Sequence, residues 1–244
     1  MSEAATQTNG TTNGNTNGAV DERPVFFFDI DNCLYSRSSN IHLHMIRLIR
    51  SYFQTHMKIP TDEAERLHQT YYRQYGLAIE GLVRHHQVDA MEFNSKVDDA
   101  LPLEECLSEN KELRGLIEEL RNKGKCRLWL FTNAYKTHGN RVIKLLGLEG
   151  LFEGITFCDY EHSPLVCKPK KEAFERAMSD AGISDKSKCY FIDDSLLNCQ
   201  AAVDFGWGKV IHKLEPEDPL PTNPATEYHC RDLMELREMC KELF

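Results

Sequence analysis

Five short runs of apolar residues along the chain predict β-strands. None of them alternates between apolar and polar positions, which is typical of parallel strands buried on both faces. The runs are VFFFDI (25–30), CRLWLF (126–131), GITFC (154–158), CYFID (189–193) and KVIHK (209–213). Between the later four lie stretches with helical spacing, near 135–146, 170–181 and 195–205. Strands that alternate with helices predict an α/β fold with a doubly wound parallel sheet.

The first and second predicted strands are separated by about 95 residues, far more than a helix and its loops require. Apolar residues within NIHLHMIRLIRSYFQTHM follow a helical period. TDEAERLHQTYYRQYG begins with a Thr suited to a helix N-cap, and Gly76 can end that helix. We therefore predict an all-helical cap inserted at 39–105 and a return helix at 111–123. The α/β core then comprises 23–38 and 106–244.

The two ends of the chain differ from the rest in composition. Residues 1–22 contain TNGTTNGNTNG and almost no large apolar side chains. Such a segment buries too little surface to offset its ordering entropy, so we predict a disordered tail. After the fifth strand, the acidic, proline-rich segment KLEPEDPLPTNPATEYH leads to a predicted final helix at 231–243.

Composition and charge restrict the class of partner. The 244 residues carry a formal net charge of -9, which argues against binding a nucleic-acid polymer. The longest apolar run is too short to span a membrane. The nine cysteines include no CxxC pair, and no signal peptide is visible, so we expect reduced thiols in the cytoplasm or nucleus. The expected partner is a small molecule.

Polar residues follow several of the predicted strands. In open parallel sheets, ligands bind beyond the carboxyl ends of the strands. Lys168 precedes a helix that Pro169 can start, and it follows the third strand. The other strand-end residues are Asp29 and Asp31 after the first strand, Thr132 and Asn133 after the second, and Asp193 and Asp194 at the fourth.

These residue types suit phosphoryl transfer. Clustered acids repel one another, and a Mg²⁺ ion bound by carboxylates, a carbonyl and waters relieves that repulsion. Together with Lys168 and the Thr132 hydroxyl, the ion can gather the outer oxygens of a phosphoryl group. Asp29 can then attack phosphorus to form an aspartyl-phosphate. Asp31 can protonate the leaving oxygen and later deprotonate the attacking water.

The motifs DIDNCLY, FTN, CKPKKEAF and FIDDS, in this order, resemble those of haloacid-dehalogenase (HAD) superfamily phosphatases. The resemblance covers about residues 23–213, and the insertion resembles the helical type 1 cap of that superfamily. FFFDIDNCLY and YYRQYGLAIEGL are similar to fungal pyrimidine 5′-nucleotidases, a group that includes lysophosphatidic-acid phosphatase relatives. The resemblance implies a HAD-like Rossmannoid core with an inserted helical cap.

The same resemblance implies a role for each strand-end residue. Asp29 is the expected nucleophile and Asp31 the general acid and base, while Thr132, Asn133 and Lys168 hold the phosphate. The expected Mg²⁺ ligands are Asp29, the backbone carbonyl of Asp31, Asp193 and, in support, Asp194. Two positions depart from the superfamily pattern, since Cys33 replaces a usual Thr and Ile192 a common Gly. Neither position carries the chemistry.

Residues of the cap are the candidates for choosing the substrate. An aromatic ring can stack on a base, and an Arg or His can bind its polar edge. The alternative is that tyrosines at helical spacing pack within the cap and that the two histidines are solvated. The candidates are Tyr71, Tyr72, Arg73, Tyr75, His85 and His86.

Each strand-end residue also has a purely structural interpretation. Asp29 and Asp31 can form a turn, Asp193-Asp194-Ser195 can cap a helix, and Lys168 can lie on the surface. Their joint order favours a Mg²⁺-dependent phosphomonoester hydrolase that takes pyrimidine nucleoside 5′-monophosphates. The alternatives are a phosphatase for lysophosphatidic acid or a sugar phosphate, and a non-catalytic protein of the same fold. A carbon–halogen hydrolase of the same fold does not need an acid at position 31, so the presence of Asp31 argues against that function. A P-loop is absent from the sequence.

Overall fold

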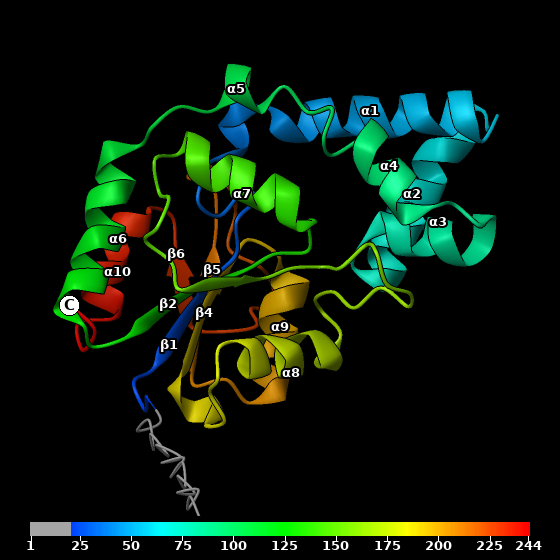
Figure 1. The fold of residues 1–244 in the computed structure, drawn as a ribbon. Helices are drawn as coiled ribbons and strands as arrows, with labels where there is room; N and C mark the ends of the chain where they lie inside the picture. Colours follow the sequence, from blue (N-terminus) through cyan, green and yellow to red (C-terminus); the bar gives the residue numbers. More distant parts are fainter. Residues whose placement is uncertain (1–20) are drawn as a thin grey trace, which may run out of the picture.

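The protein is described from a computed structural model, in which the described residues are 21–244. The predicted disordered tail lies outside the described residues except for its last two positions. Within 21–244, six parallel strands form one sheet in the order β3-β2-β1-β4-β5-β6 (Figure 1). The strands are β1 (Val25–Phe28), β2 (Arg127–Phe131), β3 (Gly154–Thr156), β4 (Cys189–Asp193), β5 (Lys209–Lys213) and β6 (Tyr228–Cys230). The five predicted strands are confirmed, and β6 was not predicted.

Helices cover both faces of the sheet because every second side chain of a strand points to the opposite face. Phe26 and Phe28 of β1 pack in one cluster with α6 (Lys111–Lys123), α7 (Lys136–Leu145) and α10 (Leu236–Met239). Val25 and Phe27 pack in another with α8 (Lys171–Asp180) and α9 (Leu196–Phe205). The sheet is therefore doubly wound, as expected for a HAD-like Rossmannoid core.

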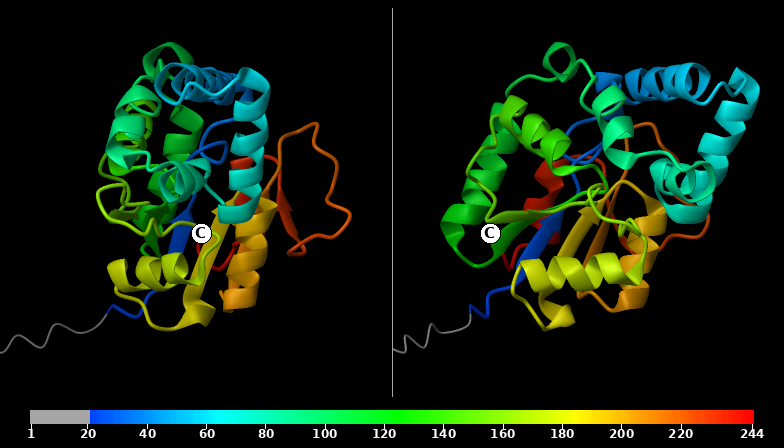
Figure 2. Two further views of the ribbon diagram at one scale, coloured as in Figure 1. Left: turned by 90° about the vertical axis from the view of Figure 1, so that its right-hand side faces the viewer. Right: turned by 45° about the vertical axis from the view of Figure 1, so that its right-hand side comes forward.

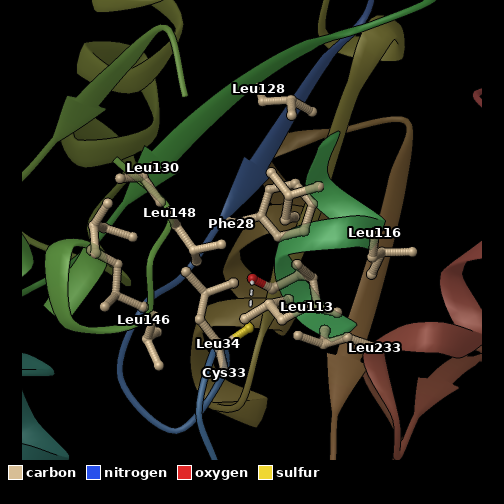
Figure 3. Packing of buried hydrophobic residues seen from close by; sticks show 14 of the residues in the cluster. Phe28, Cys33, Leu34, Leu113, Leu116, Leu128, Leu130, Leu146, Leu148 and Leu233 are labelled. Atoms are coloured by element: carbon tan, nitrogen blue, oxygen red, sulfur yellow. Dashed lines mark hydrogen bonds between the residues drawn. The ribbon is translucent and has the colours of Figure 1, made fainter. Parts of the chain in front are cut away.

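Figure 3 shows part of the first cluster, in which Phe28 lies near Leu34, Leu113 and Leu116. Phe26, Phe27 and Phe28 are all fully buried. Burying one such side chain stabilises a fold by about 1.5–3 kcal/mol relative to exposure. The central strand is thus a rigid support for the residues that follow it.

The inserted segment is helical. It contains α1 (Ile41–His56), α2 (Thr61–Tyr75), α3 (Ala78–His86) and α4 (Ala90–Lys96), followed by α5 (Leu103–Cys106). Figures 1 and 2 show α1–α4 grouped at one end of the core rather than along a face of the sheet. Their apolar cluster, centred on Phe53 and Leu82, also includes Tyr160 and Cys167 of the core. The cap therefore packs directly on core loops.

Two local predictions were wrong. Helix α2 begins at Thr61, and Pro60 occupies the N-cap position that the sequence suggested for Thr61; Gly76 ends the helix with a φ of 79°, as expected. The predicted final helix at 231–243 is only a 3₁₀ turn (Leu233–Glu235) and the four-residue α10. The chain turns back after α10 because Cys240 and Leu243 are buried in the core.

None of the helices within residues 21–244 has the length and apolar character needed to cross a membrane.

Candidate active site

Lys168 brings together two of the strand-end acids. Its Nζ lies 2.7 Å from Asp29 Oδ1 and 2.6 Å from Asp193 Oδ2. It also donates to the Phe131 carbonyl at 2.6 Å. Lys168 and Asp193 are fully buried, so each charge depends on its partner for compensation. Residues separated by more than a hundred positions thus meet at the carboxyl edge of the sheet.

Asn133 holds the backbone of Lys168 in place. Its Nδ2 donates to the Lys168 carbonyl at 2.8 Å, and its Oδ1 accepts from the Lys168 amide at 2.8 Å. The neighbouring Thr132 hydroxyl accepts from the Ala134 amide at 3.0 Å and lines the same pocket as Lys168. Asn133 therefore contributes by fixing the lysine, while Thr132 keeps a hydroxyl proton to donate.

Burial and charge work against each other at these groups. Burial lowers the pKa of Lys168, but Asp193 and Asp29 outweigh it, so the pKa is raised above its ordinary value. Burial raises the pKa of Asp29 well above its ordinary value, with Lys168 opposing and the neighbouring acids adding to the rise. A further cation beside Asp29 would keep it ionised, as a nucleophile must be.

The acids offer oxygens suited to such a cation. Asp29, Asp193 and Asp194 each present a carboxylate oxygen, and these atoms lie within 4.8 Å of one another. Burial raises the pKa of Asp194 to about 7, and Asp193 adds to the rise. An all-oxygen donor set with excess negative charge fits Mg²⁺. The Asp193 carboxylate is oriented by the Ser195 amide at 2.8 Å and by Asn198 Nδ2 at 3.1 Å.

Asp31 has a separate environment. Its Oδ1 accepts from the Tyr35 hydroxyl at 2.6 Å and lies 2.7 Å from His138 Nε2. Burial raises the pKa of Asp31, but the nearby His138 and both hydrogen bonds outweigh it, so the pKa is lowered. The Asp31 carboxylate is thus not part of the group formed by Asp29, Asp193 and Asp194. This agrees with the expectation that Asp31 offers a metal ion its backbone carbonyl rather than its side chain.

A cavity of about 270 Å³ opens on this edge of the sheet. From the core it is lined by Asp29, Asp31, Thr132, Asn133, Lys168 and Asp194. The cap supplies an apolar wall of Ile41, Met45, Ile49, Leu77, Ile79 and Phe93. Its polar residues are His42, His68 and Tyr72, and Asp98 lies at the return to the core. The predicted reactive residues and the cap therefore enclose one space.

The family model of haloacid dehalogenase-like hydrolases matches residues 24–206. The chain is also 41% identical over 214 residues to Phosphate metabolism protein 8 of Saccharomyces cerevisiae, which covers 85% of this chain and 67% of that protein.

The chain belongs to the haloacid dehalogenase-like hydrolase family.

Solved structures of this family share the fold. The HAD-hydrolase YfnB from Bacillus subtilis, bound to magnesium, superposes with a TM-score of 0.61 at 18% identity, covering 89% of this chain and 98% of that chain. A HAD phosphatase from Thermococcus onnurineus gives a TM-score of 0.59 at 21% identity, covering 89% and 97%. The HAD-like core with parallel strands, expected from the motifs, is thus shown.

Five of the six predicted cap residues are not among the described residues that line the cavity of this HAD-like hydrolase. Tyr71 packs its ring against Gly81, where an added Cβ would lie 2.1 Å from the ring, and its hydroxyl pairs with His86 at 2.9 Å. Tyr75 pairs in the same way with His85 at 2.7 Å, and Arg73 is exposed. Tyr71 and Tyr75 therefore pack within the cap, which is the alternative to substrate binding that the sequence left open. Tyr72 alone of the six lines the cavity.

Several residues that line the cavity or contact its lining were missed by sequence reasoning. His138 lies in the first turn of the helix after FTN, so its nearness to the strand end was a usable signal. The apolar wall gave no signal, because Ile and Phe at helical spacing are typical of any buried face. Ser195 caps α9, because its hydroxyl accepts a hydrogen bond from the Asn198 amide, so the capping interpretation is correct for Ser195. Asp193 of the same motif pairs instead with Lys168.

Proposed function

We propose that this HAD-like hydrolase is a Mg²⁺-dependent phosphomonoester hydrolase that takes pyrimidine nucleoside 5′-monophosphates. The observation that carries the proposal is that Lys168 pairs with Asp29 and Asp193, and that Asp29 and Lys168 line a cavity walled by the cap. A nucleophile, a cation and an oxygen-rich metal site within one cavity are the parts that phosphoryl transfer requires.

In this mechanism a carboxylate oxygen of Asp29 forms a bond to phosphorus while the bond to the leaving oxygen breaks. Asp31 must enter this step in its protonated form; it gives that proton to the leaving oxygen, and as a carboxylate it then takes a proton from the water that hydrolyses the aspartyl-phosphate. Lys168 and Thr132 bind the phosphoryl oxygens. When bound by Asp29, the Asp31 carbonyl, Asp193 and Asp194, Mg²⁺ supplies neutralisation of phosphoryl charge.

The cavity supports a substrate with one phosphoryl group. Among the cavity-lining residues within 21–244, Lys168 is the sole Lys or Arg, and both of its neighbouring acids already pair with it. A diphosphate would therefore place a second anionic group without a compensating side chain.

The same cavity supports a compact, flat leaving group. Its volume of about 270 Å³ leaves most of a long acyl chain outside the cavity, which disfavours lysophosphatidic acid as the preferred substrate. Its apolar cap wall suits the face of an aromatic ring better than a leaving group that is all sugar. A nucleobase satisfies both conditions, since its faces are apolar and its polar groups lie on one edge, within reach of His42, His68 or Tyr72.

The test is phosphate release from a panel of pyrimidine and purine nucleoside monophosphates, nucleoside diphosphates, lysophosphatidic acid and sugar phosphates. We expect pyrimidine monophosphates to give the highest kcat/KM, and Asp29→Asn to abolish release while its circular dichroism spectrum stays native. Normal turnover by Asp29→Asn would exclude the aspartyl-phosphate. A faster rate on lysophosphatidic acid or a sugar phosphate would replace the substrate assignment, and no turnover across the panel would favour a non-catalytic role.

A further inference from the structure

The carboxylate of Asp31 is held from one side only. Tyr35 and His138 both bond to its Oδ1, at 2.6 and 2.7 Å. Its Oδ2 accepts no hydrogen bond from any residue within 21–244, and Asp31 lines the cavity. Two donors on one oxygen leave the other free for a ligand and fix the plane of the carboxyl group.

The position of His138 in the fold allows it to hold the Asp31 carboxyl group. It is 1% exposed, in the first turn of α7, and the next residue is Gly139. A Cβ added at Gly139 would lie 2.9 Å from Ile155 Cδ1 and 3.2 Å from Ile30 Cδ1, so α7 packs closely on these two side chains at the glycine. The close approach of α7 lets His138 reach Asp31 from 107 positions along the chain.

The ring of His138 is oriented by its hydrogen bond to Asp31. Among the described residues, the buried Nδ1 has no hydrogen-bond partner, so the ring is buried for the single bond to Asp31. The single bond to Asp31 therefore fixes how the two side chains lie relative to each other.

We propose that His138, with Tyr35, is a positioning residue that turns Oδ2 of Asp31 toward the leaving-group oxygen of the substrate. The inference rests on the proposed function, in which Asp31 is the general acid. As the phosphorus–oxygen bond breaks, its electron pair stays on the leaving oxygen, which takes the proton from Oδ2. His138 neither gains nor loses a proton in this step; it keeps Oδ1 fixed, so that the proton lies on the oxygen facing the cavity.

The test compares substrates that differ in their need for an acid. The alkoxide of a nucleoside monophosphate requires protonation as it leaves, whereas the nitrophenolate of p-nitrophenyl phosphate does not. The parameter kcat/KM covers only the steps through departure of the leaving group. We expect His138→Leu to lower kcat/KM by about 10- to 100-fold on the nucleotide and much less on the aryl phosphate.

Three variants make the result specific. His138→Gln retains a side-chain N–H and should recover part of the nucleotide rate. Tyr35→Phe removes the second donor while keeping the ring, so it tests the same arrangement if His138→Leu fails to fold. Val142→Ala, at a buried apolar site of the same helix, controls for loosening of α7 and should change both substrates equally.

The outcomes separate this inference from the proposed function. Asp31→Asn should show the strongest preference for the aryl phosphate; if it shows none, Asp31 is not the general acid and the proposed mechanism fails. If Asp31→Asn shows that preference while His138→Leu and Tyr35→Phe slow both substrates equally, the positioning role alone is overturned.

Discussion

Asp98 is a buried acid that the proposed mechanism does not use. It lines the cavity, is 5% exposed and faces His138 and Asp31. Burial raises its pKa from 3.8 to about 7, with His138 opposing and Asp31 adding to the rise. The folded protein therefore holds this proton at pH values at which the unfolded chain has released it.

Asp98 should make the protein less stable as the pH rises. Between pH 3.8 and about 7 the folded state binds more protons than the unfolded state, so the free energy of unfolding falls with pH. Asp98→Asn removes this loss. The difference in free energy of unfolding between Asp98→Asn and the wild type should grow in favour of the variant by up to roughly 4 kcal/mol from pH 4 to pH 8, measured by urea unfolding. Asp204→Asn, at an exposed site of α9, controls for loss of one charge. A difference in free energy of unfolding between Asp98→Asn and the wild type that stays constant with pH would contradict the prediction.

Single residues also show where sequence reasoning succeeded. Asp29, Lys168 and Asp193 were predictable because parallel strands place their carboxyl ends at one edge of the sheet, whatever the details of packing. Tyr71 and Tyr75 were not assignable in the same way. The direction in which α2 turns its tyrosines depends on how closely α3 packs on it, and that depends on the absence of a side chain at Gly81.

At the scale of elements, the end of α2 touches the lysine loop of the core. An added Cβ at Gly76 would lie 2.4 Å from Pro169 Cδ and 2.5 Å from the Lys168 carbonyl oxygen. Gly76 also has a φ of 79°, which strains any other residue. The glycine that ends a cap helix thus also permits the contact between the cap and the loop that carries Lys168.

Gly76→Ala should therefore weaken both the fold and the site. We expect the free energy of unfolding to fall by about 2–5 kcal/mol, the sum of left-handed strain and overpacking, and phosphate release to slow because Lys168 must shift. Chemical denaturation and kcat/KM measure the two effects. Gly182→Ala has a similar φ of 64° and nothing within 4 Å of the added Cβ, so it should lose only about 1–2 kcal/mol and keep its activity. Equal losses in the two variants would exclude the steric explanation.

At the scale of the whole molecule, the cap is attached to the core by an ion pair as well as by apolar contacts. Glu80 of α3 is almost fully buried and lies 3.0 Å from Lys170 Nζ in the core, while Arg84 covers it from the solvent side. Below the cap, the buried Lys168 pairs with Asp29 and Asp193, and Asp194 offers a further carboxylate oxygen beside these two acids. The excess negative charge is drawn from separate parts of the chain, so a cation bound there would link them.

A divalent cation should accordingly stabilise the folded chain. At a Mg²⁺ concentration 100 times the Kd, binding to the folded state adds about 2.7 kcal/mol, which corresponds to a rise in Tm of about 5–10 °C for a chain of this size. Thermal unfolding in Mg²⁺ and in NaCl of equal ionic strength measures the effect, and EDTA should reverse it. Asp193→Asn should lose most of the rise. An unchanged Tm at saturating Mg²⁺ would contradict the proposed metal site.

The linear sequence determined which segments form the first five strands, where the helices are inserted, and which side chains meet at the carboxyl edge of the sheet. These follow from local periodicity and from the rule that ligands bind at the carboxyl edge of a parallel sheet. The tertiary structure decided which cap residues reach the cavity and that His138 and Tyr35 hold Asp31. Those features depend on the rotation of each helix about its axis and on packing between distant residues, which no local pattern encodes.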